Sequence, residues 1–289
     1  MSFSNTGSVD GSRAATAVPG SRRGVSLSKW KSPRLRRVLR GTVGILGFLI
    51  VWQMVPLLGL ADPQYLPPAT DVIVVFVQKL TEPSFLIAVS QTMKAWVLGF
   101  GISVGSGVII GLIIGSSTFL KRATHSTIEF LRPIPSVAMI PLAVLFFGIK
   151  LESELFLIFL AAFWPVLIQV MYGIADVDKV AEDTARSMQL GFVSRIRYLV
   201  WPTVLPYLLT GIRLAAAIAL VMAITTELII GTPGLGKSVV QAQANNQITL
   251  MFALILTSGV IGVAINGLTR VFEHQVLFWH HSVRAEIAA

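Results

Sequence analysis

Long apolar runs constrain the fold of this chain more than any other feature. Six runs approach or exceed the roughly 20 residues that a helix needs to cross a hydrocarbon core about 30 Å thick. They cover residues 41–61, 95–120, 133–149, 155–175, 204–230 and 248–269. Only 13% of the residues are charged, whereas a typical soluble domain carries about 25%. The sequence therefore predicts an all-α integral membrane protein with six transmembrane helices.

Two of the runs contain unusual residues. The third is short and is interrupted by Pro135 and Pro141, and the fifth carries Arg213 and Glu227. Charges inside a membrane are costly and indicate function or specific packing. For Arg213 two interpretations stay open, a side chain that reaches the cytoplasmic interface and a role in packing. Glu227 is expected to face protein or a water-filled path.

The basic residues indicate orientation, because Lys and Arg accumulate on the cytoplasmic side. With six spans, 18 of the 23 basic residues fall on the side of the termini, so both termini are predicted to be cytoplasmic. Residues 1–40 alone hold nine Lys and Arg residues and one Asp. We predict a disordered tail attracted to anionic lipid, and no nucleic-acid partner. Its Ser- and Arg-rich composition would also suit an organellar transit peptide.

One string matches a nucleotide-binding motif. Residues 231–238 read GTPGLGKS and fit GxxxxGK[ST], in which backbone amides cradle a phosphate while Lys and Ser bind outer phosphates and magnesium. Here the string joins two predicted spans on the external face, and Pro and Gly are also typical of a tight turn. We therefore interpret it as a turn. The alternative is a membrane-bound, nucleotide-using enzyme that depends on Lys237.

No metal or catalytic cluster stands out. The chain has no cysteine, and its four histidines offer one local pairing, His125 with Glu129. Two ligands are too few for a typical zinc site. We predict no metal, no cofactor bound by this chain and no enzymatic activity of its own, which leaves transport. An ion-gradient-driven carrier is an alternative, but such carriers often show internal repeats and several intramembrane acids, which are not evident here.

The most informative segment outside the membrane is residues 176–201, between the fourth and fifth runs. Val180, Thr184 and Met188 recur at four-residue spacing and form a narrow apolar ridge on an otherwise charged helix. Gly191 then offers a break before a second amphipathic piece. A short amphipathic helix of this kind can dock into a groove of a partner, or it can lie on lipid headgroups.

This segment resembles a known signature. Residues 183–202 match the spacing of EAA-x3-G-x9-I-x-L-P, which marks the permease subunits of binding-protein-dependent ABC importers. Ala185 and Pro202 are retained, whereas Asp183, Thr184 and Gln189 replace the family's Glu, Ala and Gly. Other stretches are similar to the sulfonate, taurine and nitrate branch of that family: residues 128–149, 204–215, 226–228, 234–236 and 278–279. The similarity covers residues 41–284, which we expect to form the transmembrane domain.

The resemblance implies an importer permease in the cell inner membrane for a small, mostly anionic nutrient such as a sulfonate, taurine or nitrate. It would work as a pair, expected to be a homodimer, with two cytoplasmic ATPase subunits that bind ATP and magnesium and with an external solute-binding protein. A pathway lined by the third and fifth spans would include Pro135 and Glu227.

The resemblance also implies a cytoplasmic coupling helix between the fourth and fifth spans, where the permease contacts its ATPase. The residues expected at this contact are Val180, Glu182, Asp183, Thr184, Ala185, Arg186, Met188, Gln189, Gly191 and Pro202. Asp183 to Arg186 would face the ATPase, and Gln189 would occupy the turn, with Gly191 supplying the flexibility that the missing glycine would give.

Overall fold

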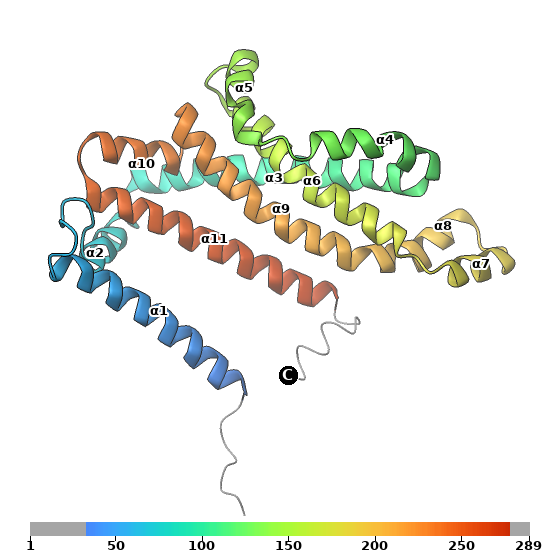
Figure 1. Ribbon diagram of the computed structural model, residues 1–289, viewed down its shortest axis with the longest axis horizontal. Helices are drawn as coiled ribbons and strands as arrows, with labels where there is room; N and C mark the ends of the chain where they lie inside the picture. Colours follow the sequence, from blue (N-terminus) through green and yellow to red (C-terminus); the bar gives the residue numbers. More distant parts are fainter. Residues whose placement is uncertain (1–32, 278–289) are drawn as a thin grey trace, which may run out of the picture. The chain divides into compact units, whose positions relative to one another are not determined.

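A computed structural model describes residues 33–277, and every regular element in that range is a helix (Figure 1). The elements are α1 (Pro33–Leu57), α2 (Ala69–Lys79), α3 (Pro83–Ser116), α4 (Thr118–Leu131), the 3-10 turn η1 (Ser136–Met139), α5 (Ile140–Phe147), α6 (Leu151–Ala175), α7 (Lys179–Ser187), α8 (Phe192–Arg195), the π-helical turn η2 (Ile196–Val200), α9 (Trp201–Ile230), α10 (Leu235–Ala244) and α11 (Ile248–Val276). The chain divides into two compact units, Met1–Gly44 and Ile45–Ala289. The described part of the first unit is the beginning of α1, and the second unit holds the other helices.

α1 begins at Pro33, inside the residues assigned to the basic tail. Its apolar part begins at Gly41, and the boundary of the tail at residue 40 stays a prediction. Proline is well suited to the first position of a helix, because its fixed φ fits the helix and its missing N–H has no partner there. Residues 1–32 lie outside the described range, and so does the predicted similarity at Phe278 and Trp279.

Several helices are long and apolar enough to cross a membrane. Four qualify by length and composition: α3, α6, α11 and the stretch Val193–Ile230 that contains α9. α4 and the η1–α5 piece meet at a bend of 80° and form a fifth candidate together. The apolar part of α1, Gly41–Leu57, is shorter. The described residues 33–277 thus form an all-helical, multi-pass membrane protein.

The bend between α4 and α5 follows from the prolines of the third apolar run. α4 ends at Leu131, and η1 begins directly after Pro135. Proline lacks an N–H and also restricts the residue before it, so Pro133 and Pro135 both oppose a continuous helix. Pro141 is tolerated because it lies in the first turn of α5. The run predicted as one span is therefore broken into short helical pieces.

α6 is central to the core, because it packs along both α3 and α9. Glycines of α3 permit the first of these contacts. A Cβ atom on Gly107 would lie 2.9 Å from Cβ of Val166, and one on Gly111 would lie 2.9 Å from Cβ of Val170. Small residues let two helix backbones approach closely, and this packing is a main source of helix association in lipid.

Polar contacts connect α9 to two further helices. The indole N–H of Trp96 in α3 donates to the Ala216 carbonyl at 2.9 Å. Arg213 pairs with Glu273 of α11, with Nη1 and Oε2 3.2 Å apart. The structure therefore favours the packing interpretation of Arg213 over a side chain directed only at the interface.

Candidate functional site

The segment between α6 and α9 starts at a well-capped helix. Asp178 is the N-cap of α7, and its Oδ1 accepts a hydrogen bond from the Val180 N–H at 2.8 Å. Such a cap satisfies one of the amides that a helix leaves unpaired at its start. Upstream, the Tyr207 hydroxyl of α9 donates to Oδ2 of Asp176 at 2.9 Å. These contacts hold the entry to α7 in place.

α7 ends in a Schellman motif with Gln189 at its turn. The Leu190 N–H donates to the Ala185 carbonyl at 3.0 Å, and the Gln189 N–H donates to the Arg186 carbonyl at 2.9 Å. Gln189 adopts φ 55°, in the left-handed region where glycine is usual. Gly191 has no positive φ. Gln189 itself therefore makes the turn, as expected, and the flexibility expected of Gly191 stays a prediction.

A shared ion pair ties α7 to α8. Oε1 of Glu182 accepts a hydrogen bond from Nη2 of Arg186 at 2.8 Å and another from Nη2 of Arg195 at 2.8 Å. The first pair lies along one face of α7, whereas the second spans the turn between the two helices. Exposed single pairs contribute little to stability. The Glu182–Arg195 contact matters because it fixes the angle between two short helices.

The predicted apolar ridge lies at the surface. Val180 is 73% exposed and Met188 is 71% exposed. Together with Thr184 they line a hollow of about 400 Å³, which is also lined by Tyr198 and Leu199 of η2. An exposed apolar hollow on a short helix is suited to receive an apolar side chain of a partner.

Ala185 differs from its neighbours in the signature. It is only 7% exposed, yet it lines the same hollow as Val180, Thr184 and Met188, so its contact with a partner stays a prediction. Asp183, Thr184 and Arg186 are exposed. Successive helical residues are rotated by about 100°, so Ala185 lies on the side of α7 that faces η2. Pro202 is exposed in the first turn of α9.

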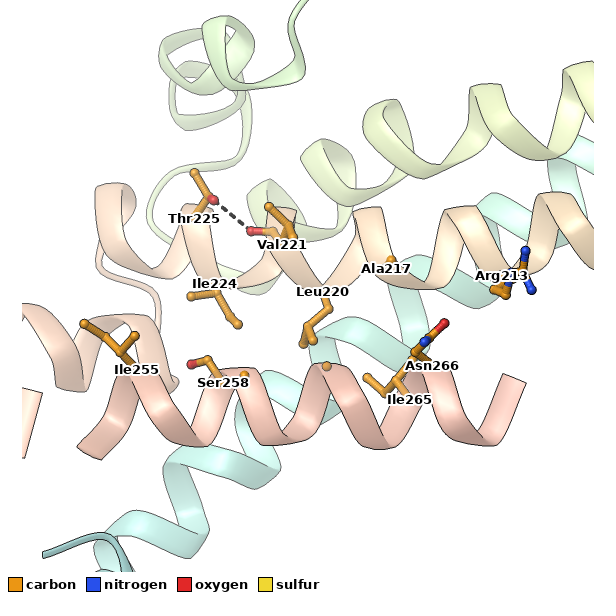
Figure 2. A pocket seen from close by; sticks show the side chains of 12 residues that line it. Arg213, Ala217, Leu220, Val221, Ile224, Thr225, Ile255, Ser258, Ile265 and Asn266 are labelled. Carbon is orange, nitrogen blue, oxygen red and sulfur yellow. Dashed lines mark hydrogen bonds between the residues drawn. The ribbon is translucent and has the colours of Figure 1, made fainter. Parts of the chain in front are cut away.

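A second hollow, of about 550 Å³, lies between α9 and α11 (Figure 2). Its walls are mostly apolar side chains, with polar groups at intervals: Arg213, Thr225, Ser258 and Asn266. Figure 2 shows Arg213 and Asn266 at the same end of the hollow. The Thr225 and Ser258 hydroxyls donate to carbonyls of their own helices, Val221 and Leu254. The side chains of Arg213 and Asn266 are thus the most polar part of the lining of this hollow.

The string that matches a phosphate loop has its amides occupied by the protein. The Leu235 N–H donates to Oγ1 of Thr92 at 2.9 Å, and the Gly236 N–H donates to Oε2 of Glu227 at 2.7 Å. A Cβ atom on Gly234 would lie 2.0 Å from Oε1 of Glu227. Glu227 therefore takes the place that a phosphate would need, and it caps the start of α10. The string is a turn and a helix start.

The two residues predicted for the solute pathway lie apart from both hollows. Glu227 is fully buried against the start of α10, and Pro135 is exposed before η1. Neither lines the hollow between α9 and α11 or the hollow beside α7. Their place on the pathway stays a prediction.

Sequence patterns missed several residues that shape these sites. Asp176, Tyr207 and Arg195 anchor the segment around α7, and Thr92 caps α10 from α3. Asp178 is the one cap that the sequence could have revealed, because an Asp directly before a helix is a typical N-cap signal. The other contacts join residues that are far apart along the chain. Nδ1 of His125 lies 3.4 Å from Oε2 of Glu129, and both side chains are exposed. The histidines His280 and His281 lie outside the described residues.

Two relatives align with most of the chain. The putative aliphatic sulfonates transport permease protein SsuC of Bacillus subtilis (strain 168) is 29% identical over 234 residues, which cover 81% of this chain and 85% of SsuC. The taurine transport system permease protein TauC of Escherichia coli (strain K12) is 28% identical over 263 residues, 89% of this chain and 95% of TauC.

The fold and the family model agree with these relatives. A crystal structure of an amino acid ABC transporter with histidines is similar, with a TM-score of 0.57 at 20% identity, over 69% of this chain and 98% of that chain. Residues 107–277 match the family described as binding-protein-dependent transport system inner membrane component. That range contains both hollows and the whole of α7. The chain belongs to this family and is a permease subunit of an ABC importer in the inner membrane.

Proposed function

We propose that this permease imports a small nutrient with a sulfonate group and works as one of two copies, driven by two ATPase subunits and supplied by a solute-binding protein. The relatives named for aliphatic sulfonates and for taurine support this solute class, since taurine is itself an aliphatic sulfonate. ATP and magnesium belong to the partner subunits, and the Gly231–Ser238 turn takes no part in binding them.

The surface formed by α7 and η2 is proposed as the contact with the ATPase. Val180 and Met188 line the hollow with exposed apolar area, and Asp183 and Arg186 are exposed charged residues of the same helix. An apolar centre with a polar rim is the usual anatomy of a protein interface. Ala185 and Gln189 act indirectly in this proposal, because one packs α7 against η2 and the other forms its turn.

The proposed topology has six spans with both termini in the cytoplasm, formed by residues 41–284 behind a basic tail of residues 1–40. The first span is α1, which has 25 residues although its apolar part is short. Exposed apolar side chains such as Phe48, Ile50 and Val51 suit contact with lipid. The bend between α4 and α5 divides the third span into two arms.

The hollow between α9 and α11 is proposed as part of the solute route. Its volume of about 550 Å³ falls within the range of small-molecule sites. Arg213 at one end offers an anion a cationic partner, although the arginine already pairs with Glu273. A second copy beside α9 and α11 would close the open side of this hollow.

Co-purification tests the coupling surface. Val180→Asp combined with Met188→Asp places two charges in the hollow, and we expect loss of the ATPase from purified complexes and loss of taurine uptake. Phe119→Asp is the matched control, because Phe119 is a comparably exposed apolar residue at the start of α4. Retention of the ATPase by the double variant, or its loss in the control alone, would contradict the proposal.

A further inference from the structure

The turn η2, which joins α8 to α9, is wound more widely than the helices on either side of it. The Trp201 N–H donates to the carbonyl of Ile196, five residues earlier. In α8 the Arg195 N–H donates to the carbonyl of Gly191, four residues earlier, at 3.0 Å. A π-helical turn is rare, and it occurs mostly as a single turn inside an α-helix and frequently at a functional site. η2 therefore interrupts the regular pairing of one long helix that runs from α8 through α9.

Pro202 accounts for the wide turn. η2 continues into α9 without a break, so Pro202 lies inside a helix. A proline there lacks the N–H that would bond to the carbonyl four residues earlier, and its ring clashes with that carbonyl. The carbonyl in question belongs to Tyr198, in the middle of η2. A wider turn gives the ring room, and it leaves the helix with weaker backbone pairing at this point.

Side-chain packing does not hold η2 in place. None of its residues is buried, and Tyr198 is 71% exposed. Close packing begins again at Val204 of α9, which lies against α6, because a Cβ atom on Gly173 would be 2.9 Å from the Cα atom of Val204. A segment with few buried contacts and irregular hydrogen bonds opens more easily than a packed core does. η2 is thus the least constrained part of this long helix.

η2 lies between two parts of the chain that are each held together. On one side, Oε1 of Glu182 accepts hydrogen bonds from Arg186 and Arg195, and α7 and α8 thereby form one unit. On the other side, α9 packs along α6 and α3. Among the described residues, α7 packs along none of the long helices α3, α6, α9 and α11. The hollow of about 400 Å³ that α7 and η2 both line gives the unit room to move.

We propose that η2 is a hinge about which α7 and α8 turn as one unit against the bundle of α3, α6 and α9. Hinges are commonly a few residues at the ends of elements that absorb changes in φ and ψ. The hydrogen bond between Asp176 and Tyr207 fixes the entry to α7, so the unit is held at two points and rotates about the line through them. This rotation opens or closes the hollow that α7 and η2 line.

The hinge bends the long helix without breaking it. Because the Trp201 N–H stays bonded to the Ile196 carbonyl, a displacement along the axis of α9 still passes from α8 to α9. The inference makes no claim about the solute, and the measurement below detects a hinge whether or not the protein carries taurine.

Distances between two spin labels in the complete transporter test the hinge. The chain has no cysteine, so a first pair, Ser187→Cys in α7 with Tyr172→Cys in α6, places one exposed label on each side of η2. The control pair, Leu214→Cys in α9 with the same Tyr172→Cys, lies within the bundle. Labelled chains are diluted with unlabelled ones so that each complex holds one labelled copy.

We expect the first pair to give a broader range of distances than the control pair, or a distance that shifts when ATP is added. The control pair should give one narrow distance that ATP does not change. A first pair that is as narrow as the control and equally unaffected by ATP would overturn the proposal.

A proline substitution locates the hinge within the segment. Pro202→Ala supplies an N–H for the Tyr198 carbonyl and lets η2 adopt regular α-helical pairing. We expect narrower distances for the first pair and slower hydrogen exchange of residues 196–203. Pro206→Ala is the matched control, because Pro206 lies inside α9 beside the buried Leu205, and it should behave like the wild type. Equal effects of the two substitutions, or no effect of Pro202→Ala, would refute a hinge at η2.

Discussion

At the scale of single residues, Gln189 has a conformation that helix ends usually give to glycine. Its φ of 55° completes the Schellman motif after α7. The left-handed conformation costs an L-residue roughly 1–2 kcal/mol, and β-branched side chains suffer most. The contacts around α7 must offset this cost, so the turn depends on the hydrogen bonds of Leu190 and Gln189 rather than on backbone freedom.

Substitution of Gln189 tests this account of the turn. Gln189→Val should destabilise the end of α7 by about 1–2 kcal/mol. Gln189→Gly should be neutral or slightly stabilising, because relief of strain competes with the greater entropy of the unfolded glycine. Hydrogen exchange of the α7 amides measures the difference. Equal protection in the two variants would show that the left-handed turn is not a constraint.

Single side chains also show how much of the site could be predicted from the sequence. Val180 and Met188 are exposed as their spacing predicted, because a four-residue period is a property of one helix. Ala185 was expected at the same contact; it is buried but lines the same hollow, so its part in the contact stays a prediction. The signature gives the order of residues but does not show which side of α7 the next helical turn will cover. Similarly, the Arg213–Glu273 pair joins residues that no local pattern connects.

At the scale of elements, glycines decide how closely α3 and α6 pack. Gly107 and Gly111 face α6, whereas a Cβ atom on Gly101 or Gly105 would meet nothing within 4 Å. All four lie in one apolar run of similar composition. The run therefore predicted that a span exists, but the packed face became clear only from the structure. The same holds for the third run, whose prolines were evident from the sequence but whose bend of 80° against α4 was not.

Alanine substitutions on α3 should distinguish the face that packs on α6 from the face that does not. Gly111→Ala brings a Cβ atom within 2.9 Å of Val170 and should destabilise the protein by about 1–3 kcal/mol, as overpacking does. Gly105→Ala should be neutral or gain up to about 1 kcal/mol, because alanine favours a helix. Thermal unfolding of the purified permease measures both. A greater loss for Gly105→Ala than for Gly111→Ala would contradict this packing.

At the scale of the whole molecule, the chain carries two hollows, one for each of the two contacts that we propose. The hollow beside α7 is suited to a protein partner, and the hollow between α9 and α11 has the size of a solute site. α9 leads directly from one to the other, since η2 continues into its first residue. A movement of α7 imposed by a partner would therefore reach the second hollow through one continuous helix.

Filling the second hollow tests its role in transport. Gly259→Phe adds a ring at a position with nothing within 4 Å, so the helix should form normally. We expect most taurine uptake to be lost while the complex with the ATPase still assembles. Val263→Phe, on an exposed part of α11 outside the hollow, should keep uptake. Normal uptake by Gly259→Phe would exclude the hollow from the solute route.

Cross-linking tests the central claim, that the α7–η2 surface carries the contact with the ATPase, most directly. The chain has no cysteine, so Met188→Cys introduces a single thiol at the rim of the hollow, and Phe119→Cys introduces an equally accessible one at the start of α4. A short thiol-to-amine reagent is added to native membranes that hold the complete transporter. The account predicts a permease–ATPase product for Met188→Cys that changes in yield when ATP is added, and none for Phe119→Cys. Products of equal yield from both positions, or from Phe119→Cys alone, would contradict it.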